Sequence, residues 1–225
     1  MKRLNAPKFW PIQKKTKKFV VEPKPGPHRK KRCLTIGLVI RDVLGHAQNM
    51  AEARKILLSG IVKIDGKKRN EEGFPVGLMD VIEVGNEHFR VMPGGKGLCI
   101  RKISEGESKI KLLEIKNKKI ISGKKVQLNL HDGSNIIYAG KCKTGDVIIY
   151  DIEKGEVKDI LSMDKGANIV ITNGLNTGKT GIIEKIVITK GSQINYAVVN
   201  IDGKSKLIPK KYAFVVGREK PVIEI

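Results

Sequence analysis

The chain has 225 residues, of which 40% are hydrophobic and 30% are charged, a balance typical of folded globular proteins and not of disordered ones. Lysine and arginine number 44 against 23 aspartates and glutamates, so the formal net charge at pH 7 is +21. No apolar stretch approaches the ~18 residues that a membrane-spanning helix needs, so we expect no integral membrane protein.

The first 35 residues predict a basic, extended arm. They carry 12 basic side chains and one acidic side chain. Their net charge is therefore +11, about half of the total of +21. Five prolines exclude a long helix or a central strand, and the like charges extend the segment. We expect the arm to become ordered on an anionic partner. Phe9 and Trp10 interrupt the lysines, and the sequence leaves open whether these rings stack on bases or dock the arm on the rest of the chain.

The segment after the arm predicts two helices. Apolar residues recur at i, i+3, i+4, i+7 and i+8 through 36–44, which is one face of a helix, and Thr35 stands at its N-cap position. A second helix begins at Asn49, with Glu52 at the spacing of a capping box, and Gly60 is placed to end it.

A hairpin and then a series of strands follow. An Asp-Gly pair at 65–66 separates two extended runs, which predicts a two-residue hairpin turn, and the pairs at 132–133 and 202–203 predict two more. Short alternating stretches rich in β-branched residues are typical of small β-barrels. These stretches are 80–84, 126–130, 146–150, 181–188 and 195–201.

We therefore expect an α+β chain that is mostly β. The lysine-rich stretch 101–125 contains few glycines and suggests a junction between two domains. The four predicted parts are the basic extended arm (1–35), a small helix–helix–hairpin module (36–100), a central β domain (101–163) and a C-terminal small barrel (164–225).

The run GLNTGKT at 174–180 has some likeness to a nucleotide-binding loop. A Walker A loop needs four residues between its glycines, whereas this run has three. The residues that follow, 181–188, alternate as a strand does, so no helix N-terminus would face a phosphate. We interpret the run as a turn between two strands, with Lys179 exposed at its tip, and expect no NTPase.

No residue pattern indicates catalysis, a metal site or a cofactor. The four histidines lack neighbouring ligands at metal spacing, the motifs G-x-S-x-G and H-E-x-x-H are absent, and the aspartates fall mostly in turns. Three cysteines without a C-x-x-C pair indicate a reducing compartment and neither a disulfide framework nor a cysteine zinc site. The basic N-terminus has no apolar core behind it, so we expect no secretory signal. We also expect a cytoplasmic location and no small-molecule substrate.

The charge pattern instead predicts a polyanionic partner. The proline-rich arm has a net charge of +11 (12 basic and one acidic side chain), and the compact module beside it carries further cations. This is more positive charge than an ordinary solvent-exposed surface needs. No amphipathic apolar face accompanies the arm, so nucleic acid is favoured over a membrane surface.

The order of several motifs resembles that of a known family. The helix–helix–hairpin at 36–69 resembles the S4 RNA-binding module, which some RNA-modifying enzymes share, and the turn at 174–181 resembles a KOW motif. The full set of motifs is similar to the S4e ribosomal proteins of archaea and eukaryotes, and a chain without a basic C-terminal tail resembles the shorter archaeal form. The specific motifs are KRLNAPK at 2–8, GPH at 26–28, FPVGLMDVI at 74–82 and FVVG at 214–217.

This resemblance implies a structural, non-catalytic protein of the small ribosomal subunit that binds 16S-type rRNA beside neighbouring ribosomal proteins, with an S4 module and an SH3-like KOW barrel. We expect its cations to replace counterions on phosphates, while the module reads RNA by shape. The residues expected to contact RNA are Lys2, Arg3, Lys8, Trp10, Lys14, Lys15, Lys17, Lys18, His28, Arg29, Lys30, Lys31, Arg32, Arg41, Arg54, Lys55, Lys63, Lys67, Lys68, Arg69, Asn176 and Lys179.

Two alternatives stay open at this point. An RNA-modifying enzyme with an S4 module, such as a pseudouridine synthase, would need a catalytic aspartate in a recognisable loop within 101–225, where only turn aspartates occur. A KOW-type regulatory factor would bind RNA without being a permanent component of the subunit.

Overall fold

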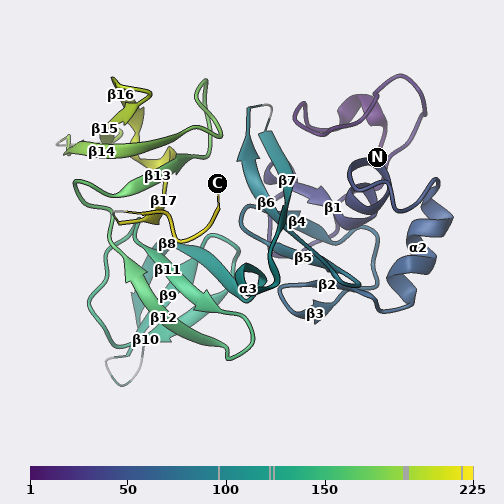
Figure 1. Cartoon of the computed structure of the whole chain (residues 1–225), viewed down its shortest axis with the longest axis horizontal. Coiled ribbons are helices and arrows are strands. Elements are labelled where there is room, and N and C mark those ends of the chain that lie inside the picture. The colour runs from purple at the N-terminus through teal and green to yellow at the C-terminus, as the bar shows by residue number, and fades with distance from the viewer. Residues whose placement is uncertain (96, 122, 124, 190–192, 219, 225) are drawn as a thin grey trace. The chain divides into compact units, whose positions relative to one another are not determined.

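The chain divides into two compact units, each described here by itself. The computed structural model describes residues 1–95, 97–121, 123, 125–189, 193–218 and 220–224. The first unit comprises Met1–Met92 and Lys96–Ser108, and the second comprises Pro93–Gly95 and Lys109–Ile225. Strands predominate in both units and helices are few, as the sequence predicts (Figure 1).

The first unit combines short helices with two sheets. β1 pairs antiparallel with β4, and a five-stranded sheet has the order β3-β2-β5-β6-β7. The elements are η1 (Arg3–Asn5), η2 (Lys30–Arg32), β1 (Cys33–Thr35), α1 (Ile36–Leu38), the π-helix η3 (Val39–Val43), α2 (Met50–Leu58), β2 (Val62–Ile64), β3 (Lys67–Lys68), β4 (Pro75–Gly77), β5 (Val81–Val84), β6 (Glu87–Gly94), β7 (Gly97–Ile103) and α3 (Glu105–Ser108).

The second unit consists of two five-stranded antiparallel sheets, with the orders β10-β9-β8-β11-β12 and β16-β15-β14-β13-β17. The sheets meet where β17 contacts β8, β11 and β12. The elements are β8 (Ile110–Ile120), β9 (Val126–Leu130), β10 (Asn135–Tyr138), β11 (Val147–Asp151), β12 (Glu156–Leu161), β13 (Asn168–Ile171), β14 (Thr180–Val187), β15 (Tyr196–Ile201), β16 (Lys204–Pro209), η5 (Lys210–Tyr212) and β17 (Ala213–Gly217).

The stretch 101–125, expected to be a junction, contains the end of β7, the short helix α3 and all of β8. The change from the first unit to the second falls between Ser108 and Lys109, within this stretch. Positions 122 and 124 of the stretch lie outside the described residues.

The first predicted helix differs from its expectation. Only Ile36–Leu38 is α-helical, and a π-helix continues to Val43. Thr35 makes no side-chain cap, and its buried hydroxyl has no hydrogen-bond partner among the described residues. The reason is tertiary: the helix amides of Ile36 and Gly37 donate to the carbonyl oxygens of Phe74 and Glu72, at 3.0 Å each, so the side-chain cap is not needed.

The second helix confirms its local signals. Asn49 Oδ1 accepts a hydrogen bond from the Glu52 backbone N–H at 2.9 Å, as an N-cap does. The Glu52 carboxylate reaches back to the N–H of Gln48, one residue earlier than a capping box predicts. The helix ends before Gly60, whose φ of +74° is the left-handed conformation that favours glycine.

The Asp-Gly hairpins are also confirmed. Asp65 and Gly66 have φ values of +50° and +73°, and Asp202 and Gly203 have +52° and +77°, so both pairs form the left-handed turns that suit a two-residue hairpin. The third pair also lies in a hairpin, between β9 and β10, but that turn is longer than two residues, and only Gly133, with a φ of +81°, is left-handed there. Local turn chemistry therefore sets the register of these strands.

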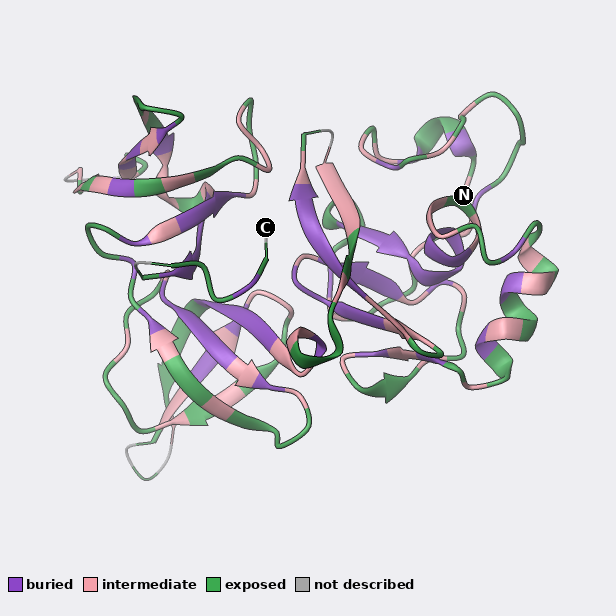
Figure 2. Cartoon of the chain, in the orientation of Figure 1, coloured by how far each residue is buried: buried purple, intermediate pink, exposed green. Residues whose placement is uncertain are grey.

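The arm is docked on the first unit, which corrects the expectation of an extended segment that orders only on its partner. Trp10 is 3% exposed and joins Ala6 and Val20 in the same core cluster as Leu34. Its indole Nε1 donates to the Cys33 carbonyl oxygen at 2.9 Å. Figure 2 shows buried and exposed positions interleaved along this segment, so one side of the arm faces the protein.

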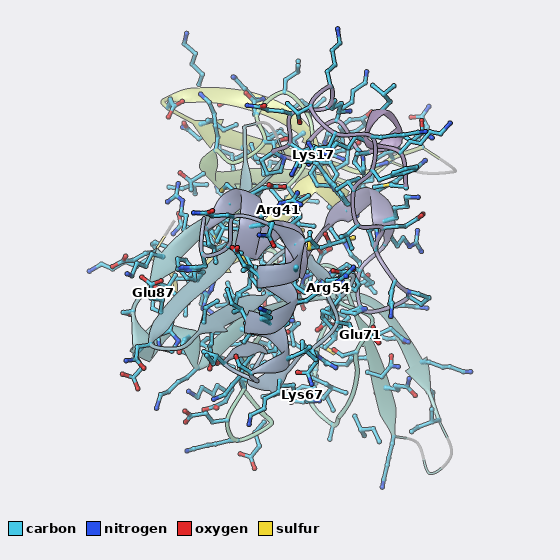
Figure 3. The ribbon with its side chains drawn as sticks, turned by 90° about the vertical axis from the view of Figure 1, so that its right-hand side faces the viewer. Lys17, Arg41, Arg54, Lys67, Glu71 and Glu87 are labelled. Carbon is cyan, nitrogen blue, oxygen red and sulfur yellow. The ribbon has the colours of Figure 1, made fainter. Side chains whose placement is uncertain are left out.

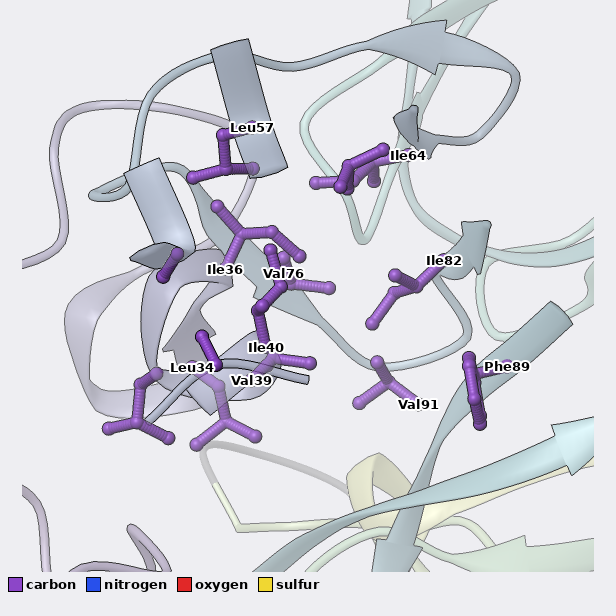
Figure 4. Packing of buried hydrophobic residues seen from close by; sticks show 14 of the residues in the cluster. Leu34, Ile36, Val39, Ile40, Leu57, Ile64, Val76, Ile82, Phe89 and Val91 are labelled. Atoms are coloured by element: carbon purple, nitrogen blue, oxygen red, sulfur yellow. The ribbon is translucent and has the colours of Figure 1, made fainter. Parts of the chain in front are cut away.

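The core beneath the arm draws on both helices and the sheets (Figure 4). Ile36 and Ile40 come from the first helical segment, Leu57 comes from α2, and Val76 and Ile82 come from β4 and β5. All of these side chains are fully buried. Because Trp10 packs into this cluster, the arm belongs to the same hydrophobic core as the helix–helix–hairpin.

Hydrogen bonds close the first twenty residues of the arm into a loop around a buried arginine. The Arg3 guanidinium donates to Gln13 O at 2.7 Å, to Thr16 Oγ1 at 2.9 Å and to Phe19 O at 3.3 Å. The N–H of Val20 donates to the Met1 carbonyl oxygen at 3.0 Å. These bonds satisfy backbone N–H and C=O groups in a segment that forms almost no β-ladder of its own.

Two glycines let the arm approach the sheets closely. A Cβ on Gly97 would overlap Phe9, and a Cβ on Gly77 would overlap the His28 ring. Any larger residue at either position would displace the arm. The position of the arm therefore depends on these two glycines of the β-sheets as well as on the arm's own sequence.

We expect Trp10→Ala to destabilise the protein by about 3 to 5 kcal/mol, because it removes a buried aromatic ring and its hydrogen bond. Urea unfolding measures the loss. Phe19→Ala is the matched control, since Phe19 is 61% exposed and a surface truncation costs within about 0.5 kcal/mol.

The thiol of Cys33 reports release of the arm. Burial, with a further contribution from Asp80, raises the pKa of this thiol to about 11, so it stays protonated and unreactive near neutral pH. In the Trp10→Ala variant Cys33 should become reactive toward iodoacetamide, while the half-buried Cys99 and Cys142 react as before. Unchanged unfolding and unchanged Cys33 protection would contradict the docked arm.

Candidate nucleic-acid interface

Most of the predicted RNA-contacting side chains lie on the surface. The half-buried residues are Lys14, Arg41, Lys63, Arg69 and Asn176. The exposed residues are Lys2, Lys8, Lys15, Lys17, Lys18, Arg29, Lys30, Lys31, Arg32, Arg54, Lys55, Lys67, Lys68 and Lys179.

Three of the predicted residues are buried instead: Trp10, Arg3 and His28. A ring nitrogen of His28 lies 2.9 Å from Asp80 Oδ2, and the same carboxylate oxygen accepts from the Gly77 N–H. Trp10 and Arg3 make the internal contacts described above. These residues hold the arm in place, and their burial leaves them no surface to offer to a ligand.

Five of the predicted cations that lie on the surface have carboxylate partners among the described residues. The Arg54 guanidinium contacts both oxygens of Glu72, at 2.5 and 2.7 Å, and this contact raises the pKa of Arg54. The Lys30 ammonium makes the same kind of contact with Glu22 and lowers the pKa of that carboxyl. We call these side chains the paired cations: Lys30 with Glu22, Arg41 with Asp42, Arg54 with Glu72, Lys63 with Glu83, and Lys179 with Asp202.

Two further cations are held by internal contacts. Lys14 donates to the Ala6 carbonyl oxygen at 3.0 Å. The Arg69 guanidinium lies 4.4 Å from the centre of the Phe74 ring, which is cation–π geometry. Both side chains remain partly accessible.

A third group consists of those predicted cations that are exposed and, within the described part of the chain, have no carboxylate partner. They lie in the arm, on α2 and in the β2–β3 hairpin. In Figure 3, Lys17 of the arm and Lys67 of β3 lie at opposite ends of the face that carries α2, with Arg54 between them in this view. We call them the unpaired cations: Lys2, Lys8, Lys15, Lys17, Lys18, Arg29, Lys31, Arg32, Lys55, Lys67 and Lys68.

The glycine-rich run at 174–180 is a turn between β13 and β14, and a strand follows it, as expected. Lys179 is exposed, as expected, but it directly precedes β14 and therefore stands at the end of the turn and not at its tip; its Nζ lies 2.9 Å from Asp202 Oδ2. The fully exposed side chain of the turn is that of Leu175. Asn176 Oδ1 accepts a hydrogen bond from Lys206 at 3.1 Å. Both predicted residues of the turn therefore contact the β15–β16 hairpin.

Metal-binding geometry does not emerge from the described residues. They contain no cluster of three or more His, Cys, Asp or Glu side chains that could hold a metal ion. Their cysteines are all free. None of the helices seen in the described ranges is long and apolar enough to cross a membrane.

The acidic partners of the paired cations were not predicted from the sequence. Lys63 and Glu83 face each other across β2 and β5, and the strand register that brings them together could not be read from either strand alone. Arg54 and Glu72 are 18 residues apart. Only Arg41 and Asp42, which are sequence neighbours, offered a local signal.

We expect the pKa of Asp202, which Lys179 holds below its usual range, to rise toward about 3.9, the ordinary value of an aspartate, in Lys179→Ala. Carboxyl chemical shifts followed through an NMR pH titration measure it. Because the pKa of Asp202 is depressed in the folded state, its ion pair with Lys179 adds to the free energy of unfolding above pH ~4. This contribution is lost as the pH falls further. Lys204→Ala is the control, and an equal response in both variants would show that Lys179 is not paired.

Family models match three parts of the chain. An RS4NT (NUC023) domain matches residues 1–31, an S4 domain matches residues 42–82, and a model described as ribosomal family S4e matches residues 85–157. The matches follow one another along the chain without overlap.

Full-length relatives extend this similarity. The small ribosomal subunit protein eS4 of Methanothermobacter thermautotrophicus is 39% identical over 229 aligned residues that cover 100% of this chain and 95% of that protein. The protein of the same name from Methanosphaera stadtmanae is 40% identical with the same coverage. The crystal structure of the 30S ribosomal protein S4e from Thermoplasma acidophilum is 33% identical with a TM-score of 0.73, covering 83% of this chain and 95% of that one.

Proposed function

Because the chain belongs to the ribosomal family S4e, we propose that it is a structural constituent of the small ribosomal subunit that binds small-subunit rRNA during translation. Its place would be in cytoplasmic ribosomes, beside neighbouring small-subunit proteins. The relatives are named as ribosomal proteins and not as enzymes, so an RNA-modifying activity is not favoured.

The observation that carries the proposal is the set of unpaired cations. Exposed ammonium and guanidinium groups without carboxylate partners are free to replace the counterions of RNA phosphates, whereas each paired cation would first have to leave its carboxylate. Eight of the eleven lie in the arm. Since the arm is docked by Trp10 and by the loop around Arg3, these charges are presented from a folded surface, and their ordering cost is met before RNA binds.

The mode of recognition that fits this surface is backbone contact read by shape. Nine of the eleven unpaired cations are lysines, whose ammonium is a point charge without the planar fork of a guanidinium. Phosphate contacts fix register and orientation, and they carry little sequence information. We therefore propose that the first unit recognises the path of a folded rRNA backbone.

We propose the following organisation for the chain: a basic arm at 1–35, an S4 module at 36–100, a central β domain at 101–163 and a small KOW-type, SH3-like barrel at 164–225. The RS4NT and S4 matches support the first two parts. The two sheets of the second unit, within 110–161 and 168–217, support the last two.

Charge-neutral substitutions in the two classes of cation test the proposal. The Lys67→Gln/Lys68→Gln variant removes two unpaired cations, and Arg54→Gln/Lys63→Gln removes two paired ones. The affinity for small-subunit rRNA, measured against salt concentration, should lose about 0.7 to 0.9 of its logarithmic slope per phosphate contact removed. We expect that loss in the first variant and a much smaller one in the second.

The salt titration also has an outcome that contradicts the proposal. If the wild-type affinity hardly changed between low and moderate salt, phosphate neutralisation would not be the main contribution to binding. Equal losses in the two variants would remove the distinction between paired and unpaired cations. Circular dichroism of both variants checks that neither has lost its fold.

A further inference from the structure

Phe19 is the one aromatic side chain that is exposed in the described part of the chain. It is 61% exposed, whereas the other aromatic rings are buried or half-buried. The sequence left open whether Phe9 and Trp10 stack on bases, and both rings pack on the core of the first unit instead. Phe19 was not among the residues expected to contact RNA. Its ring is nevertheless the exposed aromatic surface that the arm offers to a ligand.

The backbone on both sides of Phe19 is held by hydrogen bonds. The Arg3 N–H donates to the Lys18 carbonyl oxygen at 3.0 Å, and Arg3 Nε donates to the Phe19 carbonyl oxygen at 3.3 Å. The Val20 N–H donates to the Met1 carbonyl oxygen at 3.0 Å. Val20 is 7% exposed and joins the core. Because successive side chains of an extended segment point to opposite sides, the Phe19 ring is directed outward from a fixed backbone.

Two of the unpaired cations lie beside the ring. Lys2 and Phe19 stand opposite each other in an antiparallel β-bridge, and directly opposed residues carry their side chains on the same face. The Lys18 ammonium lies 5.5 Å from the centre of the Phe19 ring. The site therefore presents a flat stacking surface and two phosphate-binding groups together.

The fold does not account for this exposed ring. A surface side chain contributes little to the free energy of unfolding. Single exposed apolar residues such as Leu4 are ordinary in folded proteins and need no ligand. Phe19 differs from them in three respects, which are its flat ring, its fixed backbone and the ammonium groups beside it.

An exposed ring bordered by ammonium groups matches a nucleotide of a single strand. We propose that the Phe19 ring stacks on an unpaired base of small-subunit rRNA, with Lys2 and Lys18 at the neighbouring phosphates. Unpaired bases stack on aromatic side chains, while cations beside those rings follow the backbone. An apolar protein surface would leave the two ammonium groups without anions, so RNA is favoured over a protein partner. The stack rests on the proposed rRNA-binding function and adds a base to its backbone contacts.

The affinity of the full-length chain for small-subunit rRNA, measured over a range of salt concentrations, tests the stack. In Phe19→Ala the affinity should fall about 5- to 150-fold, which corresponds to the loss of one stacked base. The logarithmic salt slope should not change, because Phe19 carries no charge. In Lys2→Gln/Lys18→Gln the slope itself should fall, because two phosphate contacts are lost.

Two conservative substitutions distinguish stacking from simple apolar contact. Phe19→Trp keeps a flat ring and should keep the wild-type affinity, whereas Phe19→Leu keeps only an apolar side chain and should bind as weakly as Phe19→Ala. Leu4→Ala is the matched control, since Leu4 is 70% exposed in the same arm, and its affinity should not change. Urea unfolding of each variant should match the wild type, because these side chains lie on the surface.

A fully double-stranded RNA tests the requirement for an unpaired base. Proteins recognise such a duplex through its shape and backbone, and its paired and stacked bases offer no free face to the ring. The wild type and Phe19→Ala should therefore bind the duplex equally well. An equal loss of affinity for the duplex and for the rRNA would overturn the stack.

Failure of the stack differs from failure of the proposed function. Wild-type affinity of Phe19→Ala or of Phe19→Leu would overturn the stack while rRNA binding stands. Loss of all rRNA binding by the wild-type chain would overturn both proposals.

The occupant of the site can also be identified in assembled small subunits. The photoreactive residue p-benzoylphenylalanine, introduced in place of Phe19, should crosslink to rRNA. Crosslinks to protein alone would assign the ring to a neighbouring protein and would overturn the stack.

Discussion

The burial of the Trp10 indole is the interaction on which the rest of the first unit depends. The arm carries half of a net charge of +21, and like charges oppose its collapse onto a basic module. Against that repulsion, a buried indole contributes roughly 4 to 6 kcal/mol from its area, and its N–H reaches the Cys33 carbonyl oxygen. The repulsion between the cations is strongest at low salt, where it is least screened. The apolar contact does not depend on this screening, so the arm stays docked there.

Docking turns a flexible cationic segment into a fixed surface. The two kinds of cation on that surface have different physical consequences. A paired cation such as Arg54 contributes to the local structure through Glu72, whereas an unpaired one such as Lys67 adds repulsion that only an external anion relieves. In the proposed function, the phosphates of rRNA are the anions that neutralise this unpaired charge.

The features that the sequence predicted correctly are those set by neighbouring residues. Asn49 and Glu52 cap a helix through contacts three residues apart, and Asp65 forms a hairpin turn with the glycine beside it. The errors arise where a distant segment supplies the partner. Thr35 does not act as a cap because the carbonyl oxygens of another segment satisfy the helix amides. Trp10 could stack or dock on sequence grounds, and only the packed core decides between the two.

Hydrogen exchange of the free protein, without RNA, tests the preformed arm most directly. The N–H groups of Arg3, Val20 and Lys24 donate to the carbonyl oxygens of Lys18, Met1 and Gly73 at 2.8–3.0 Å. The account predicts that these amides exchange at least about a hundredfold more slowly than unprotected ones, because exchange requires the arm to open. Exchange of these amides at unprotected rates, while the amides of α2 remain protected, would show that the arm orders only on its partner.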